Sequence, residues 1–499
     1  MAGKARLVDD MIVVRPGAEE AIKSGRTRQF WREKLRDSIA DALTRGGIEH
    51  ELRLSFGRIF VATPRVDEAL GILPYVFGVS TFSPVRAVAP AEMDEIVRIG
   101  KEACHGTVRG RTYAVRCGRQ GGHSFSSVEV ERTLGAALNE GATVDLDNPE
   151  VTVRVEVLGG RAVITEERRQ GAGGLPAGMQ GRALALLSGG YDSAVAAWRT
   201  MRRGVELDLL LCNLGGAAQE RMVLQVAKFL YEAWGHGQQS RFHVLDFRPV
   251  MEDIRAHIRP GLWQVALKRQ MYRAGCRVAA ETKAEALVTG EAIGQVSSQT
   301  LGNLQAIEPV ADRPVLRPLL GFDKQEILDA ARAIGTAPLS ERVRETCALA
   351  GGRPAVRSRP GTLERAEAAL DPALLAHGVE GRKVLDLRKV TPDELRQPYL
   401  FVRDISEDAV VIDCQPRHMY RAWHAPGAEH WEADRLARDY RRLPREKTYV
   451  LYCTFGTQTP VLAELMQQAG YEAYAFEGGL SRVQACVEGK ETEAVRRAV

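Results

Sequence analysis

The stretch ALALLSGGYDS (residues 183–193) decides the fold of the middle of the chain. Five apolar residues predict a buried strand, two glycines predict a tight turn, and the following AVAAWRTMRR predicts a helix. Apolar runs that alternate with helical segments recur at residues 207–212, 242–246 and 287–289. This alternation is typical of a doubly wound parallel sheet with helices on both faces. The sequence therefore predicts an α/β domain over residues 182–350.

Two smaller α+β patterns precede this domain, over residues 1–62 and 63–170. In the first we expect a helix at 27–45 and strands at 11–15, 51–54 and 59–63. In the second we expect helices at 93–104 and 129–138 and strands at 112–117 and 151–157. The glycine-rich residues 171–181 are interpreted as a linker to the α/β domain.

A second, smaller α/β domain is predicted over residues 401–499, after a linker and helical segment at 351–400. Its expected strands are residues 409–413, 448–453 and 472–476, with helices between them.

Composition excludes several classes of protein. The 499 residues are 45% hydrophobic and 26% charged, which is the balance of a globular chain and not of a disordered one. The sequence has no apolar run of about 18 residues, so we expect no membrane span, and it shows no signal-peptide pattern at its start. Its eight cysteines are scattered without metal-type spacing, which favours a cytoplasmic protein with reduced thiols.

The SGGYDS turn is the first candidate site. Backbone amides at a helix N-terminus, left open by Gly189 and Gly190, can bind a polyanion, and Ser188 and Ser193 can add hydroxyl donors. Asp192 beside phosphate implies an intervening Mg²⁺. An ordinary capped turn is the alternative for SGG alone. The full motif is neither GxxxxGK[ST] nor GxGxxG, and it resembles the PP-loop of ATP pyrophosphatases.

Ligands of an open α/β sheet gather at the carboxyl ends of its strands, next to the switch point. The further candidates for ATP binding at that edge are Leu186, Leu187, Leu211, Cys212, Gly290 and Gln299. Lys268 and Lys324 can supply positive charge to phosphates, although each lysine taken alone also fits a solvated surface position.

Cys453 is the candidate sulfur site. It follows the apolar strand TYVLY and precedes a loop and a helix, so backbone amides and a helix end would stabilise negative charge on its sulfur. VVIDC (410–414) and HAPGA (424–428) resemble motifs of rhodanese domains. Gln458 and Thr459 stand where a phosphatase loop would need arginine, so phosphatase activity is disfavoured. A buried thiol is the alternative for Cys453. Cys347 is either a plain thiol or a group that attacks a persulfide.

Residues 108–125 form a candidate RNA-binding stretch without an acidic residue. The candidates are Arg109, Arg111, Arg116, Arg119 and His123, accompanied by Tyr113 and Phe125. A basic, solvated strand face is the alternative. A second basic cluster, with the same two interpretations, comprises Arg26, Arg28, Arg32, Lys34 and Arg36.

Longer motifs carry a resemblance over essentially the whole chain. YAVRCGRQGGHSFSSVEVER with VDLDNPEVTVRVEV resembles a THUMP domain. LLSGGYDS, CNLGGA, ALVTGEAIGQVSSQTLGNL and RPLLGFDKQEI, followed by Cys453, resemble the tRNA 4-thiouridine synthase family. The resemblance implies ferredoxin-like, THUMP, PP-loop and rhodanese-like domains in that order.

The resemblance also implies roles for residues. Asp192, Lys268, Gly290 and Gln299 would contact ATP, and Lys324 would be needed for activity. Cys453 would carry a persulfide, and Cys347 would be its disulfide partner during turnover. The uridine that is adenylated and thiolated is expected at position 8 of tRNA.

The partners that the resemblance implies are tRNA, a cysteine desulfurase as sulfur donor, and a sulfur-carrier protein of thiamine synthesis. Two other interpretations stay open at this stage. One is an RNA-binding adaptor with an inactive PP-loop, and the other is a sulfur donor for thiazole formation.

Overall fold

A computed structural model describes residues 5–20, 22–343, 355, 357–358, 360–391, 400–406, 408–454 and 458–487. The chain divides into two compact units, which are described separately below. The N-terminal unit comprises Met1–Gly181 with the short segments Met201–Glu206 and Ala233–Gln238, and the C-terminal unit comprises the remaining residues. None of the helices in the described ranges is long and apolar enough to cross a membrane.

The first sheet of the N-terminal unit is antiparallel, with its strands in the order β11-β5-β2-β4-β3. The bounds of these strands are Met11–Pro16 (β2), Glu51–Ser55 (β3), Arg58–Ala62 (β4), Val79–Pro84 (β5) and Arg169–Gln170 (β11). Helices α1 (Gly25–Arg45) and α2 (Val66–Ile72) cover one face, where Ile12 and Val14 pack with Trp31 and Leu35. The strands and the helix predicted within residues 1–62 are confirmed as β2, α1, β3 and β4.

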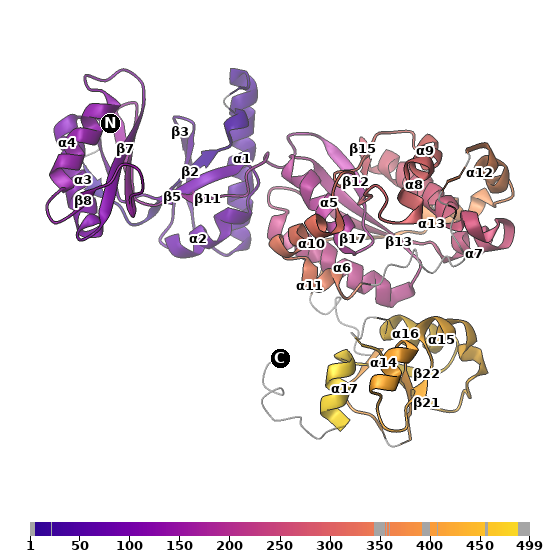
Figure 1. Cartoon of the computed structure of the whole chain (residues 1–499). Coiled ribbons are helices and arrows are strands. Elements are labelled where there is room, and N and C mark those ends of the chain that lie inside the picture. Colours follow the sequence, from indigo (N-terminus) through magenta and orange to yellow (C-terminus); the bar gives the residue numbers. More distant parts are fainter. Residues whose placement is uncertain are drawn as a thin grey trace. The chain divides into compact units, whose positions relative to one another are not determined.

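The second sheet is mixed, with its strands in the order β1-β6-β10-β9-β7-β8. The bounds are Arg6–Leu7 (β1), Ala87–Pro90 (β6), Thr112–Gln120 (β7), Thr143–Val144 (β8), Val151–Leu158 (β9) and Arg161–Thr165 (β10). Helices α3 (Met93–Val108) and α4 (Ser127–Leu138) lie side by side on one face, as Figure 1 shows. Helix α4 begins at a capping box in which Ser126 and Glu129 satisfy each other's backbone amides.

The chain crosses between these two sheets more often than the sequence pattern indicates. Strand β1 precedes the first sheet but pairs with β6 in the second, and β11 follows the second sheet but pairs with β5 in the first. Strand β5 belongs to the first sheet but lies beyond residue 62, where we expected the first α+β domain to end. Strands of two residues carry no readable periodicity, which is why the sequence does not reveal this exchange.

Glu156 joins the two sheets through a buried group of charges. This carboxylate on β9 is 8% exposed and accepts from the Nε of Arg15 on β2 at 2.6 Å and from the Nε of Arg58 on β4 at 2.9 Å. Arg15 also donates to the hydroxyl of Ser83 on β5. Burial by itself raises the pKa of Glu156, but the attraction of Arg15 and Arg58 outweighs it, so the pKa is lowered.

We expect Glu156→Gln to destabilise the N-terminal unit by about 3–5 kcal/mol, because it leaves Arg15 as a buried charge without its counter-ion. A lowered carboxylate pKa contributes stability above the ordinary value of 4.5, and this stability is lost as pH falls through the lower native value. Hydrogen exchange of the β2 and β9 amides, followed in the full chain as pH falls below 4.5, measures both effects. Glu68→Gln, which removes the exposed partner of Arg65, is the control and should change neither. Wild-type exchange in Glu156→Gln would contradict this role for the carboxylate.

The third sheet, in the C-terminal unit, contains the strand and turn of residues 182–190 that lead into helix α5 (Tyr191–Arg202). Its strand order is β16-β15-β12-β13-β14-β17. The pairs β16–β15, β15–β12 and β13–β14 are parallel, and the edge strand β17 is antiparallel to β14. The bounds are Arg182–Leu186 (β12), Glu206–Asn213 (β13), Arg241–Asp246 (β14), Ala286–Val288 (β15), Val315–Leu316 (β16) and Lys383–Asp386 (β17). The prediction of a doubly wound, largely parallel sheet is confirmed.

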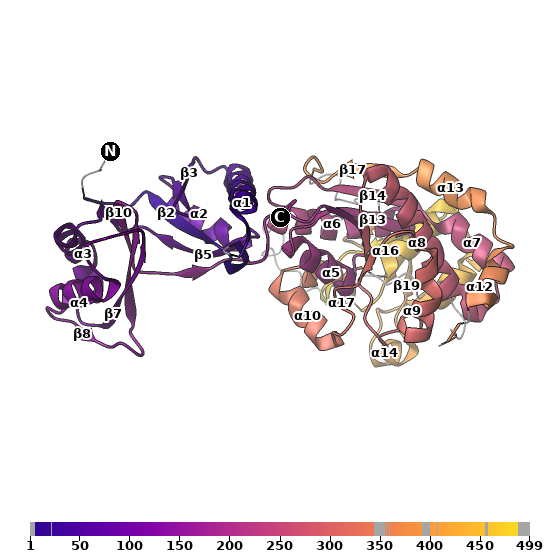
Figure 2. The same cartoon turned by 90° about the horizontal axis from the view of Figure 1, so that it is seen from above.

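Helices cover both faces of this sheet. In Figures 1 and 2, α5 (Tyr191–Arg202) and α6 (Gly216–Trp234) lie on one side of the strands, and α8 (Trp263–Thr282) lies on the other. Leu184, Leu210 and Leu287 of the sheet share one core with α7 (Arg248–His257) and α8. Strand order reverses between β12 and β15, so the topological switch point lies there.

Part of the expected linker belongs to this α/β domain. Within residues 351–400, helices α12 (Pro360–Glu367) and α13 (Pro372–Glu380) pack on the core of the third sheet through Leu363, Leu375 and Val379. Strand β17 then pairs with β14. The shorter helices α9 (Leu301–Ile307), α10 (Lys324–Ala333) and α11 (Ala337–Ser340) complete the domain.

The fourth sheet is wholly parallel, with its strands in the order β18-β22-β21-β19-β20. The bounds are Phe401–Val402 (β18), Val410–Asp413 (β19), Glu429–His430 (β20), Thr448–Tyr452 (β21) and Glu472–Phe476 (β22). Its helices are α14 (Arg417–Ala422), α15 (Ala433–Asp439), α16 (Thr459–Gln468) and α17 (Gly479–Val487). The predicted second, smaller α/β domain is confirmed.

Candidate active site

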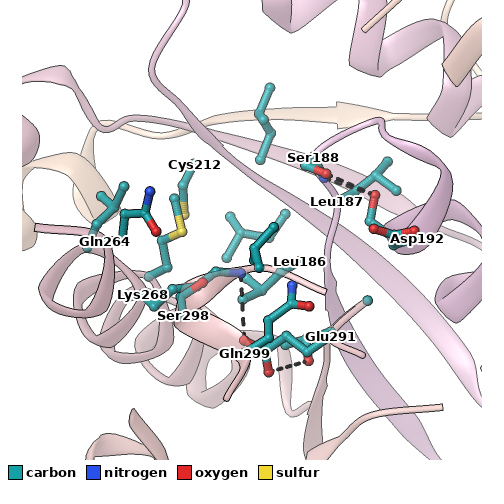
Figure 3. Close-up of a pocket in the computed structure, with 18 of the residues that line it drawn as sticks. Leu186, Leu187, Ser188, Asp192, Cys212, Gln264, Lys268, Glu291, Ser298 and Gln299 are labelled. Carbon is teal, nitrogen blue, oxygen red and sulfur yellow. Dashed lines mark hydrogen bonds and ion pairs between the residues drawn. The ribbon is translucent and has the colours of Figure 1, made fainter. Parts of the chain in front are cut away.

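A cavity of about 200 Å³ opens at the carboxyl ends of β12, β13 and β15, beside the switch point (Figure 3). This is the place where an open α/β sheet binds its ligands. Most residues predicted to bind ATP line this cavity, namely Leu186, Leu187, Ser188, Asp192, Ser193, Leu211, Cys212, Lys268, Gly290 and Gln299. The fold therefore brings together side chains from four segments that are far apart in the sequence.

Ser193 closes the glycine turn at one end of the cavity. The amide of Ser188 donates to the Ser193 hydroxyl at 3.2 Å, and that hydroxyl donates to the carbonyl of Gly190 at 3.1 Å. Gly189 has a φ of +84°, and a Cβ there would lie 2.9 Å from Val223. Only glycine fits this position without strain. Helix α5 begins at Tyr191, so its first amides face the turn and can bind an anion.

Asp192 is held by two side chains from other segments. One carboxylate oxygen accepts from the Nζ of Lys324 at 2.9 Å, and the other accepts from the Nε2 of Gln295 at 2.8 Å. Lys324 is the first residue of α10, and its Nζ also lies 5.7 Å from the centre of the Tyr191 ring. The two sequence candidates Asp192 and Lys324 thus form one ion pair at the edge of the glycine turn.

The residues present do not form a magnesium site of their own. Within the described ranges, no group of three or more His, Cys, Asp or Glu side chains is arranged to hold a metal ion. Asp192 supplies a single carboxylate, and both of its oxygens already accept hydrogen bonds. Such a carboxylate suits only a Mg²⁺ ion that is bound mainly by phosphates.

Glu291 is a cavity residue that the sequence analysis did not single out. It is 1% exposed and accepts from the Tyr272 hydroxyl at 2.6 Å and from the Nε of Arg317 at 2.9 Å, and it lies 3.6 Å from the Nζ of Lys268. Burial raises its pKa, but Lys268, the Tyr272 hydrogen bond and Arg317 together hold the pKa below its usual range. Lys268 is therefore a paired cation inside the site. An acid directly after an apolar strand, as in LVTGE, was the available signal.

The remaining wall of the cavity is apolar. Leu186, Leu211, Cys212, Leu267 and Met271 line it, and polar side chains such as Gln264 and Ser298 border this apolar part. Figure 3 shows Leu186 between the glycine turn and Glu291, and Cys212 on the far side of the cavity beside Gln264. This arrangement suits a ligand that combines a flat, weakly polar ring system with a polyanion.

Cys453 directly follows β21 and is 5% exposed, so its thiol is buried between that strand and helix α16. Its carbonyl accepts from the amide of Leu480. The strand–cysteine–helix order predicted from the sequence is thus present. Residues 455–457 of the loop, and Cys347, lie outside the described residues.

The candidate RNA-binding residues divide into two groups. Arg109 and Arg111 are exposed at the end of α3. Arg116 donates to the carbonyl of Leu146, Arg119 to that of Phe125, and a ring nitrogen of His123 lies 2.7 Å from the carbonyl of Gly159. These three side chains are half-buried and hold loops of the second sheet in place.

The aromatic residues of this stretch do not face solvent. Tyr113 is fully buried and donates to the carbonyl of Gly135, and Phe125 is 8% exposed in the same core. Phe125 lies beside Arg119, as the sequence places it, with the guanidinium carbon 5.9 Å from the ring centre. Tyr113 and Val115 are two residues apart on β7 and therefore share one face of the sheet, and both belong to the same core.

Comparison with known proteins places each part of the chain in a described family. Family models match at residues 11–83 (ThiI ferredoxin-like domain), 90–166 (THUMP domain), 178–371 (Thiamine biosynthesis protein, ThiI) and 398–486 (Rhodanese-like domain). These matches agree with the four sheets described above.

Curated relatives match over almost their whole length. A tRNA sulfurtransferase of Pyrobaculum aerophilum is 38% identical, over 96% of this chain and 99% of the relative. One of Marinobacter nauticus is 35% identical, over 92% of this chain and 98% of the relative. Among solved structures, a 4-thiouridine synthetase–RNA complex with bound ATP matches with a TM-score of 0.67 and 30% identity, over 76% of this chain and 99% of that one.

The four domains and these relatives define the chain as a sulfur-transferring enzyme. More particularly, the chain belongs to the tRNA sulfurtransferase family, because relatives that are 38% identical align with 94–96% of it.

Proposed function

We propose that this enzyme is an ATP-dependent tRNA sulfurtransferase that converts a uridine of tRNA to 4-thiouridine. The observation that carries the proposal is the convergence of the glycine turn, Lys268 and the Lys324–Asp192 pair on one cavity with an apolar wall. The solved 4-thiouridine synthetase with bound ATP and RNA supports the same assignment.

ATP would bind with its adenine against the apolar wall and its phosphates at the glycine turn. The amides that begin α5 and the hydroxyl of Ser188 would donate to phosphate oxygens. Lys268, and Lys324 once it releases Asp192, would balance their charge. Mg²⁺ would enter as part of the MgATP substrate, since the site offers it one carboxylate at most.

Adenylation would make the oxygen on C4 of uracil a good leaving group. That oxygen attacks the α-phosphorus of ATP, pyrophosphate departs, and the base carries AMP on its former carbonyl oxygen. Donors at the glycine turn would stabilise the charge that develops on pyrophosphate. A sulfur nucleophile then replaces AMP at C4.

Cys453 would carry that sulfur as a persulfide, received from a cysteine desulfurase. The start of α16 near this thiol favours an anionic sulfur, and tethering to the nucleotide domain raises the effective concentration of the persulfide. The proposed role of Cys347 is to form a disulfide with Cys453 during turnover.

The N-terminal unit would hold the RNA. Arg109 and Arg111 are exposed cations of the predicted stretch and are proposed to contact phosphates. The side chains of Arg116, Arg119 and His123 would instead hold the loops next to this surface through their contacts with backbone carbonyls. Such a surface would recognise the folded shape of the RNA more than its base sequence.

A second candidate function is delivery of sulfur for thiazole formation in thiamine synthesis, through a small sulfur-carrier protein. The specific observation in its favour is the match of residues 178–371 to a family described as a thiamine biosynthesis protein. The same Cys453 persulfide would serve both acceptors.

The decisive experiment is mass spectrometry of nucleosides from unmodified tRNA incubated with the enzyme, MgATP and a persulfide source. We expect 4-thiouridine only when ATP is present, together with release of pyrophosphate. Persulfide transfer without any ATP consumption would favour the adaptor interpretation and overturn the proposal.

A further inference from the structure

We propose that Cys414 is a second functional thiol, which discharges the persulfide of Cys453 as hydrosulfide and forms a Cys414–Cys453 disulfide. The inference rests on the proposed role of Cys453 as sulfur carrier. It adds a partner inside the same domain and needs no movement of another domain.

The register of the fourth sheet places these two cysteines opposite each other. Strands β19 and β21 pair in parallel, with Asp413 opposite Tyr452 as the last pair, so Cys414 and Cys453 are the next pair along. The amide of Cys414 donates to the carbonyl of Tyr452 at 2.8 Å, which keeps the backbones together at this point.

Side-chain bonds on both sides hold that alignment. The hydroxyl of Tyr452 donates to Asp413, and one residue beyond the cysteines the hydroxyl of Thr454 lies 3.2 Å from the side-chain oxygen of Gln415. The cysteines therefore lie between two cross-strand contacts, and the segments have not begun to separate there.

Both thiols lie on the same face of the sheet. Ile412, Cys414, Leu451 and Cys453 belong to one hydrophobic core, whereas Val450 and Tyr452 belong to the core on the opposite face. Neighbouring Cα atoms on paired strands lie about 5 Å apart, which is within the range that a disulfide spans.

Cys414 is buried, so its thiol cannot react with a partner at the protein surface. It is 2% exposed, and both burial and the neighbouring Cys453 sulfur raise the pKa of its thiol well above the usual range. Cys414 is therefore a neutral thiol, and its proton can pass to the terminal sulfur of a Cys453 persulfide only as the sulfur–sulfur bond of that persulfide breaks.

The step balances without an oxidant. The Cys414 thiol gives its proton to the terminal sulfur of the persulfide, and the Cys414 sulfur attacks the Sγ of Cys453. The sulfur–sulfur bond of the persulfide breaks, hydrosulfide leaves with the electron pair, and the Cys414–Cys453 disulfide remains. An external dithiol reductant then restores both thiols and is itself oxidised to a disulfide.

The test uses the full chain loaded with sulfane sulfur from thiosulfate and then freed of donor, without ATP or RNA. Hydrosulfide release is timed, and peptides are mapped without reduction. We expect Cys414→Val to load Cys453 normally but to release hydrosulfide at least tenfold more slowly, and to lose the peptide that links Cys414 to Cys453. Cys276→Val, which removes another buried thiol from α8, is the matched control and should behave as wild type.

Hydrosulfide release from Cys414→Val at the wild-type rate would overturn the inference, as would a map in which Cys453 is linked only to Cys347. A parallel sample of unloaded wild-type protein treated with the thiol oxidant diamide should also give the Cys414–Cys453 peptide, whether or not the variant folds. If Cys453 accepts no sulfur, the proposed carrier role fails. The diamide sample still reports separately whether the two thiols pair.

Discussion

Cys453→Ser is expected to lose tRNA thiolation by on the order of 1000-fold while it retains tRNA-dependent release of pyrophosphate from ATP. Serine fills the same space beside β21 but cannot form a persulfide, so sulfur has no carrier on the enzyme. The nucleotide cavity has its own strands and helices and should be unaffected. Nucleoside mass spectrometry and a pyrophosphate assay on the same samples separate the two half-reactions.

Cys486→Ser is the matched control for this variant. Cys486 is a half-buried thiol of α17 in the same domain, and its replacement should leave both half-reactions near their wild-type rates. Full thiolation by Cys453→Ser with enzyme-bound sulfur would remove Cys453 from the proposed reaction and point to another thiol.

Gly290→Ala should reduce ATP-dependent pyrophosphate release by about 100-fold, because displacement of reacting groups by even 1 Å can cost that much. A Cβ at position 290 would lie 2.6 Å from the backbone of Asp192 and Ser193, which is closer than real Cβ atoms come. The clash is with backbone atoms at the start of α5, so a rotamer change cannot relieve it. The glycine turn itself must shift.

Gly321→Ala controls for adding a methyl group to the same domain, since nothing lies within 4 Å of a Cβ there. We expect it to keep wild-type ATP turnover. Persulfide loading of Cys453 should be normal in both variants, as measured by alkylation and mass spectrometry. Normal pyrophosphate release from Gly290→Ala would show that the glycine turn does not bind the reacting phosphates.

Sequence reasoning predicted the long, strongly patterned elements of this chain. The apolar strand before SGGYDS, the alternating strand at residues 151–157 and the strand before Cys453 all appear where their periods place them. It did not predict the two-residue strands β1 and β11 or the edge strand β17, because so few residues carry no period and pair only through tertiary contacts.

The sequence motifs identified most residues of the candidate site but not the ion pairs and hydrogen bonds between them. The motifs identified Asp192 and Lys324, but their ion pair joins residues that are far apart in the sequence. The same holds for Glu291, whose partners Tyr272 and Arg317 come from α8 and from a loop after β16. Burial of Tyr113 could have been inferred from the apolar run Tyr-Ala-Val that it begins, but the neighbouring arginines drew attention to RNA binding instead.

The strand exchange between the first two sheets limits how this protein can be shortened. A piece ending at residue 62 would lack β5 and so leave β2 without one of its neighbours, and a piece starting at residue 63 would lack β1. Neither piece contains every strand of its own sheet, so any shortened version of the protein has to keep or remove the two sheets together. Useful truncations of the N-terminal unit therefore have to run past Gln170, where its last strand is complete.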